Sequence, residues 1–213
     1  MIQKQAAMCA ILLTVSSAFC GTAFAAPLQG TEKAAVSAES ALHVDSSRWN
    51  YDKDNDIYYQ IGLVYCKNPA ASEYESLSVY VPGAYMKGTP NADGTYTCQI
   101  SDKGKVGEYT ARTAPVIMPV NTGGYAAQKA PSSYAPKGLN TYLSQGFVYV
   151  FAGCRGRDNG TNPDGTTFDG GAPWGVTDLK AAVRYLRYND SFLPGNKDRI
   201  FTFGHSGGGA QSA

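Results

Sequence analysis

The feature that most constrains this chain lies near its carboxyl end, where residues 204–208 (GHSGG) fit the pattern G-x-S-x-G. A β-prone run, residues 199–203 (RIFTF), leads directly into it. This order predicts a strand that turns into a helix within about one residue, with Ser206 at the apex in a strained backbone conformation. Glycine is needed at the first and last positions, because side chains there would collide where strand and helix meet.

Such a turn has a chemical consequence. It lifts the Ser206 hydroxyl clear of the sheet and places the Gly207 amide at a helix N-terminus, where it can donate a hydrogen bond to an oxyanion. A G-x-S-x-G sequence also arises by chance in surface loops rich in Gly and Ser, but the apolar strand before it favours a nucleophile elbow. The sequence therefore predicts an α/β fold of the α/β-hydrolase type, with Ser206 as the catalytic nucleophile.

An acyl-transfer serine needs a second amide donor, which usually comes from a Gly-Gly loop after an earlier strand. Residues 121–125 (NTGGY) occupy that place, directly after the apolar run 114–120. We expect Gly123 or Gly124 to complete an oxyanion hole with Gly207, and the sequence does not choose between the two glycines. A β-turn without a catalytic role is the alternative.

The catalytic acid and base have no clear candidate in the sequence. In α/β-hydrolases they follow the serine, in the order Ser, Asp or Glu, His, whereas the sequence ends at Ala213. Of the two histidines, His43 lies in an expected linker and His205 stands beside the nucleophile with its side chain expected to point away. We therefore expect the 213 residues to be the N-terminal part of an enzyme, with an incomplete hydrolase fold that lacks the triad acid and base.

The N-terminal region predicts export. Residues 1–25 combine Lys4, an apolar stretch too short for a comfortable membrane span, and an A-x-A cleavage site, as a secretory signal peptide does. A retained membrane anchor is the alternative. We expect a secreted or periplasmic protein that makes no membrane contact after cleavage. Residues 26–47, rich in Ala, Ser and Thr, read as a linker, and residues 48–213 as the N-terminal part of the hydrolase domain.

Charge and cysteine content narrow the range of partners. The chain has 18 Lys and Arg against 17 Asp and Glu, and the signal peptide removes only Lys4, which leaves 17 of each. This balance argues against nucleic acid or a charged membrane as the main partner and favours a small, weakly charged molecule. Three cysteines remain after cleavage, with a spacing that does not fit a zinc site, so we expect buried free thiols and neither metal nor cofactor. They are Cys66, Cys98 and Cys154.

Hydrophobic patterns indicate the main elements. Two β-prone runs predict antiparallel first strands, two apolar runs predict internal strands, and a short stretch between them predicts a hairpin strand. A helix is predicted by apolar residues that recur at spacings of three and four, Val176, Leu179, Val183 and Leu186. Strand, helix and elbow strand then form a right-handed βαβ unit. The β-prone runs are residues 57–65 and 77–82, and the apolar runs are 114–120 and 147–152. The hairpin strand is 95–100 and the helix is 173–189.

Three further residues lie where ligands bind in open α/β sheets. Arg155 and Arg157 follow the strand at 147–152. Their guanidinium groups either orient a substrate carboxylate or brace the loop, or else form salt bridges to Asp158, Asp164 or Asp178. Trp174 either lines the pocket or packs under the predicted helix. The sequence leaves these alternatives open.

Taken together, these pieces resemble the bacterial tannases, the tannin acyl hydrolases of subtype B, which are close to feruloyl esterases. The resemblance covers most of residues 57–213 and is carried by residues 58–63, 77–82, 121–125, 152–157, 178–190 and 204–208. It implies an α/β-hydrolase with a lid inserted later in the chain, hydrolysis of galloyl esters such as tannic acid and simple gallates, and Ser206 as nucleophile. The family's acid, base and lid residues have no counterpart among the 213 residues.

Two other functions stay open. One keeps the fold and changes the substrate, as in a feruloyl esterase, a general carboxylesterase or a serine peptidase. The other is a non-catalytic fragment or pseudoenzyme, because a serine without its base loses nearly all turnover.

Overall fold

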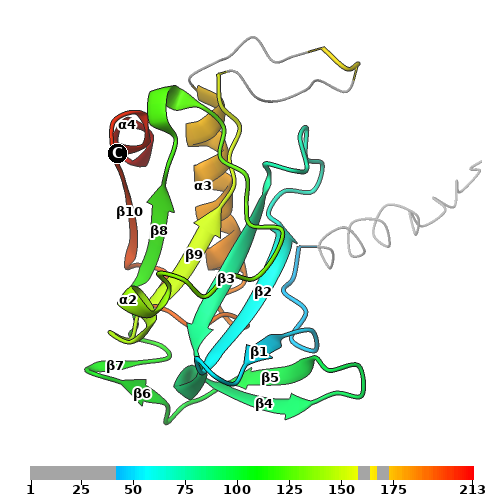
Figure 1. The fold of residues 1–213 in the computed structure, drawn as a ribbon, viewed down its shortest axis with the longest axis vertical. Coiled ribbons are helices and arrows are strands. Elements are labelled where there is room, and N and C mark those ends of the chain that lie inside the picture. Colours follow the sequence, from blue (N-terminus) through cyan, green and yellow to red (C-terminus); the bar gives the residue numbers. More distant parts are fainter. Residues whose placement is uncertain (1–41, 158–163, 167–172) are drawn as a thin grey trace, which may run out of the picture.

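The structure is a computed structural model, and it describes residues 42–157, 164–166 and 173–213 (Figure 1). The expected signal peptide, most of the expected linker and most of the loop at 158–172 lie outside the described residues, so export stays a prediction. Within the described ranges, no helix is both long and apolar enough to cross a bilayer.

A six-stranded sheet forms the centre of the molecule, with the strand order β1-β2-β3-β9-β8-β10 (Figure 1). β1, β2 and β3 pair antiparallel, β3 pairs antiparallel with β9, and β9, β8 and β10 run parallel. This confirms the prediction of antiparallel first strands followed by a parallel sheet. The strands are β1 (Asn50–Asp52), β2 (Ile57–Val64), β3 (Ser76–Pro82), β8 (Val116–Val120), β9 (Val148–Ala152) and β10 (Ile200–Gly204).

The order of the parallel strands differs from their order in the chain. β9 lies between β3 and β8, and the chain then passes through α3 (Pro173–Tyr188) to β10 on the other side of β8. The predicted helix and elbow strand are therefore confirmed, but β9 and β10 both pair with β8 and not with each other. Because the three strands are parallel, the loops that follow them meet at one edge of the sheet.

Shorter strands and helices lie outside the six-stranded sheet and α3. The expected strand at 95–100 is confirmed as one half of a hairpin, whereas several two- to five-residue strands were not predicted from the sequence. These elements are η1 (Gly83–Tyr85), β4 (Met86–Pro90), β5 (Tyr96–Ile100), β6 (Lys105–Val106), β7 (Tyr109–Thr110), η2 (Gly123–Tyr125), α2 (Asn140–Leu143) and α4 (Gly207–Ser212).

Helix α3 covers one face of the sheet, and Leu179 and Leu186, two of the four residues expected on its apolar face, are buried there (Figure 1). Val176 and Val183 lie at its margin and are only half-buried. The apolar spacing found only part of the stripe, because the stripe also contains Asp178, which an apolar pattern excludes and which is buried in the fold by an ion pair described below. The residues that α3 buries are Gly175, Asp178, Leu179, Ala182, Tyr185 and Leu186.

The other face carries a cluster of tyrosines. Tyr80 of β3 is buried, and the ring of Tyr134, from the loop after β8, stacks on Tyr59 of β2 at 4.0 Å between centroids. The Tyr134 hydroxyl donates a hydrogen bond of 2.6 Å to Asp52 Oδ2. The chain that follows β8 is thereby fastened across this face, where Leu143 of α2 packs in the same cluster as Tyr80.

The described part of the expected linker, residues 42–47, packs on the folded unit. Val44 is buried, and its amide donates to Asn189 Oδ1 at 2.8 Å. Asn189 Nδ2 in turn donates to the Leu42 carbonyl at 2.9 Å. These contacts fasten residues 42–47 to the C-terminal end of α3, so this segment is part of the domain.

The three remaining cysteines are free thiols, as expected. Cys98 and Cys154 are buried and Cys66 is half-buried. Burial raises the pKa of each thiol to about 12, so none is an ionised nucleophile at neutral pH.

Candidate active site

The elbow has the geometry that its sequence predicts. Ser206 connects β10 to α4 with φ 55° and ψ −124°, a region of backbone space that is almost restricted to glycine. Its side chain is exposed at the edge of the sheet where the parallel strands end. A strained, exposed serine at the start of a helix is the arrangement of a nucleophile elbow.

The two flanking glycines are required by close backbone contacts. A Cβ on Gly204 would lie 2.3 Å from the Val120 carbonyl oxygen and 2.5 Å from the carbonyl carbon of Gly208. A Cβ on Gly208 would lie 2.1 Å from the same Val120 oxygen. The predicted collision between strand and helix is therefore confirmed, and the structure adds that the end of β8 is the nearer obstacle.

The Gly-Gly loop packs directly on the elbow. A Cβ on Gly207 would lie 2.6 Å from both the Thr122 oxygen and the Tyr125 nitrogen, and 3.1 Å from the Gly124 nitrogen. Gly124 and Tyr125 both have positive φ, at 60° and 62°. The structure thus brings the predicted residues Gly207 and Gly124 side by side, although β8 and β10 are separated by about eighty residues of chain.

Some backbone amides of this region donate hydrogen bonds within the fold, and others do not. The Tyr125 amide donates to the Thr122 carbonyl at 3.0 Å, and the Ala126 amide to the Gly123 carbonyl at 3.2 Å. The amides of Gly123, Gly124 and Gly207 make no hydrogen bond within the described ranges. They are the donors that an oxyanion hole needs.

Two buried glutamines hold this loop, and neither was predicted from the sequence. Gln128 accepts a hydrogen bond from the Asn121 amide at 2.5 Å and donates one to the Ala152 carbonyl at 2.6 Å, so it joins the ends of β8 and β9. Gln211 of α4 accepts a hydrogen bond from the Thr122 hydroxyl. Only Thr122 had a sequence signal, its position inside the NTGGY segment.

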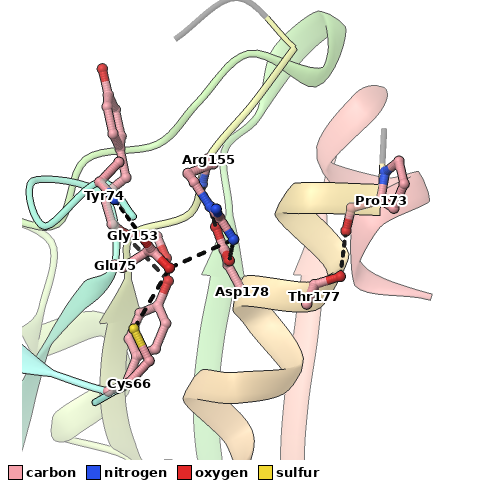
Figure 2. A network of polar contacts seen from close by, with 10 residues as sticks. Cys66, Tyr74, Glu75, Gly153, Arg155, Pro173, Thr177 and Asp178 are labelled. Carbon is pink, nitrogen blue, oxygen red and sulfur yellow. Dashed lines mark hydrogen bonds and ion pairs between the residues drawn. The ribbon is translucent and has the colours of Figure 1, made fainter. Parts of the chain in front are cut away.

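Of the two roles considered for Arg155, a ligand contact or an ion pair within the fold, the structure shows the ion pair. Its guanidinium forms a two-pronged ion pair with Asp178 of α3, with Nε–Oδ2 at 2.9 Å and Nη2–Oδ1 at 2.6 Å, and its backbone amide donates to the same carboxylate at 2.8 Å (Figure 2). Both side chains are buried. The pair therefore braces the N-terminal part of α3 against the end of β9 and leaves no face of Arg155 open to a substrate carboxylate.

The same cluster extends toward β2 and β3. Glu75 Oε1 lies 3.6 Å from Arg155 Nη2, and Cys66 Sγ donates to the same oxygen at 3.6 Å (Figure 2). Glu75 also accepts a hydrogen bond of 2.5 Å from the Ala71 amide. The hydrogen bonds to Asp178, together with the negative charges of Asp178 and Glu75, raise the pKa of Arg155 above its ordinary value. The network is a buried group of paired charges.

Arg157 and Trp174 differ from Arg155 in exposure. Arg157 is exposed, and its Nη2 lies 3.7 Å from where a Cβ on Gly124 would be, at the rim of the Gly-Gly loop. Its amide donates to the Tyr125 carbonyl at 3.0 Å. Trp174 is partly exposed and its ring lies over the Arg155 guanidinium at 4.8 Å, so it shields the ion pair as a cation–π partner.

Neither histidine is placed as a general base for Ser206. The His43 ring stacks on Tyr188 with centroids 4.7 Å apart, and its Nε2 lies 3.0 Å from the Tyr188 hydroxyl, at the end of α3. His205 is exposed and makes no hydrogen bond through its side chain within the described residues.

Solved structures of tannases match this fold. A tannin acyl hydrolase in complex with ethyl gallate has a TM-score of 0.58 and 35% sequence identity, over 73% of this chain and 32% of that chain. A tannase from Lactobacillus plantarum has a TM-score of 0.66 and 30% identity, over 83% of this chain and 36% of that one. The chain is similar to part of a bacterial tannase. The tannase of Fusobacterium nucleatum agrees, with a TM-score of 0.64 and 29% identity over 80% of this chain and 34% of that chain.

These matches confirm the resemblance to tannases and the α/β-hydrolase fold, but only for part of the tannase structures. The chain spans about a third of the length of the tannase structures it matches. No protein-family model and no curated protein matches the sequence. One of the matching tannin acyl hydrolases is in complex with ethyl gallate, a galloyl ester, and another with 3,4-dihydroxybenzoate.

Proposed function

We propose that this chain is the nucleophile-bearing part of a serine ester hydrolase of the tannase type, which cleaves galloyl esters. One observation carries the proposal. Ser206 lies exposed at a positive-φ junction between β10 and α4, in a fold that is similar to solved tannases at about 30% identity or more.

In this proposal the Ser206 hydroxyl attacks the ester carbonyl. The bond to the alcohol breaks, a galloyl-serine forms, and water then hydrolyses it to release gallate. Negative charge on the carbonyl oxygen is stabilised by the Gly207 amide together with that of Gly123 or Gly124, which lie free beside Ser206. Of the two, Gly124 has its amide within reach of Gly207.

The general base and the acid come, in the same proposal, from residues outside these 213. Support comes from the position of His43 against Tyr188, and from relatives that are about three times as long as the matched part. Residues 26–213 alone are then a non-catalytic piece with a correctly shaped elbow. Appreciable turnover of an ester by that piece would overturn this part of the proposal.

The deciding experiment uses the full product of the gene with methyl gallate as substrate. We expect Ser206→Ala to lower kcat by about 10⁴-fold or more, because no acyl-enzyme can form. Ser212→Ala is the matched control, since Ser212 is on the helix that follows the elbow and its hydroxyl donates a hydrogen bond to the Gly209 carbonyl at 2.9 Å. Wild-type-like activity in Ser206→Ala would remove the proposed nucleophile.

The choice of acyl group needs its own comparison. The ethyl gallate complex of a matching tannin acyl hydrolase favours galloyl esters over the feruloyl and general carboxylesterase alternatives. Rates on methyl gallate, methyl ferulate and p-nitrophenyl acetate, measured side by side, separate these. A preference for ferulate or acetate would keep the esterase and reject the tannase.

We also propose export through residues 1–25. N-terminal sequencing of the protein from the medium or periplasm should begin after Ala25. A mature protein that still carries Met1 would reject this cleavage.

A further inference from the structure

A buried pair of polar side chains joins the Gly-Gly loop to the elbow helix. The Thr122 hydroxyl donates to Gln211 Oε1 of α4, and the two residues are 0% and 5% exposed. They are 89 positions apart in the chain. Figure 1 shows the turn after β8 lying against α4, which is where this hydrogen bond forms.

Thr122 faces the elbow with its backbone as well as its side chain. Its carbonyl accepts the Tyr125 amide at 3.0 Å and lies 2.6 Å from where a Cβ on Gly207 would be. Its next neighbour in the chain is Gly123. A displacement of Thr122 therefore moves the amides of Gly123 and Gly124 relative to that of Gly207.

Gln211 is itself held in place from the far side. A Cβ on Gly175 of α3 would lie 2.3 Å from Gln211 Nε2, so glycine at that position leaves room for the side-chain amide. The same Cβ would lie 3.0 Å from the Arg155 carbonyl oxygen. Gln211 is thus wedged between α3 and the Gly-Gly loop, with its oxygen toward Thr122.

We propose that Thr122 and Gln211 form a positioning pair that fixes the distance between the two halves of the oxyanion hole. This inference rests on the proposed function. Neither side chain needs to touch the substrate, because the pair acts through the amides of Gly123 or Gly124 and of Gly207. Amide donors stabilise the transition state only when they are aimed at the oxyanion, so a loosened pair lowers kcat more than it changes KM.

The first test measures turnover of methyl gallate by the full gene product. Thr122→Val keeps the side-chain shape and removes the hydroxyl, and we expect kcat to fall about 10- to 100-fold, with KM changed by less than about threefold. Thr122→Ser restores the hydroxyl and should recover most of the loss. An equal loss in both variants, or a loss confined to KM, would contradict the proposal.

Thr202→Val is the matched control. Thr202 of β10 also donates a hydrogen bond to α4, from Oγ1 to the Ser212 carbonyl at 2.7 Å, and no hydrogen bond among the described residues joins its side chain to the Gly-Gly loop. We expect this variant to lower the urea midpoint of unfolding to a similar extent as Thr122→Val, and to keep its kcat. If both variants lose kcat alike, the effect is a general one of stability.

The second test does not depend on catalysis, so it stands even if Ser206→Ala shows that the proposed function is wrong. Amide hydrogen exchange of Tyr125 and Ala126, whose amides are hydrogen-bonded within the loop, should be about tenfold faster in Thr122→Val than in Thr202→Val. Gln211→Leu should give the same acceleration. The double variant should exchange no faster than either single variant, because both substitutions remove the same hydrogen bond, the one between Thr122 and Gln211. Unchanged exchange in Thr122→Val would overturn the positioning role.

Discussion

The carboxyl ends of β9 and β10 lie at the same edge of one sheet and have opposite characters. β9 leads into Arg155, whose guanidinium is buried and engaged by Asp178 and Glu75. β10 leads into Ser206, which is exposed, strained and next to amides that no described group engages. A sequence search for ligand contacts at strand ends selects both residues, but Arg155 is buried in an ion pair whereas Ser206 is exposed.

The difference shows how polar residues at such an edge are best distinguished. A buried charged group that is held by an ion pair contributes to the frame, whereas unused donors beside a strained residue indicate a place where charge develops during a reaction. Three substitutions test this contrast, beginning with the largest change in stability.

Asp178→Asn removes one charge from the buried ion pair. We expect the free energy of unfolding to fall by about 3 kcal/mol or more, because Arg155 is left buried with an incomplete counter-charge. Urea unfolding of the purified protein measures this. The matched control is Glu73→Gln, which breaks the exposed pair of Glu73 with Lys129 at 2.8 Å and should cost less than about 1 kcal/mol. Equal costs would mean that the Arg155 cluster is not the brace described above.

Gly208→Ala tests the crowded side of the elbow. The added Cβ would meet the Val120 carbonyl oxygen at 2.1 Å, so strand or helix must shift. We expect the free energy of unfolding to fall by about 1–3 kcal/mol and esterase activity to be lost as well. Gly123→Ala is the control, because a Cβ there meets nothing within 4 Å. Thermal unfolding of the two variants should differ clearly, and a stable Gly208→Ala protein would argue against the close approach of β8 and α4.

Ser206→Gly tests the strain at the apex. Glycine adopts the φ of 55° without steric cost, so this variant should be more stable than Ser206→Ala by about 1 kcal/mol, while both lack activity. Parallel urea titrations of the two inactive variants isolate the strain from the chemistry. The same stability in both would show that the backbone at Ser206 is relaxed.

Local patterns predicted much of the fold. The strands at 57–64, 116–120 and 148–152 and the helix at 173–188 follow from runs and spacings within a few residues, and the elbow follows from sterics between Gly204 and Gly208. β3 shows the limit of such patterns. Its alternating sequence predicts one polar face, yet all seven residues are buried, Ser78 included, because β2 and β9 flank it and both faces are covered.

The sequence by itself determined where Ser206 of the elbow stands and which glycines surround it, because the requirement for glycine arises from backbone contacts within a short turn. Only the tertiary structure decided what Arg155 does and what holds the Gly-Gly loop. Arg155 finds Asp178 at a separation of 23 residues, and Thr122 finds Gln211 at 89. Partners so far apart leave no periodic trace in the chain, and their hydrogen bonds exist only once the strands have been placed in the order β9-β8-β10.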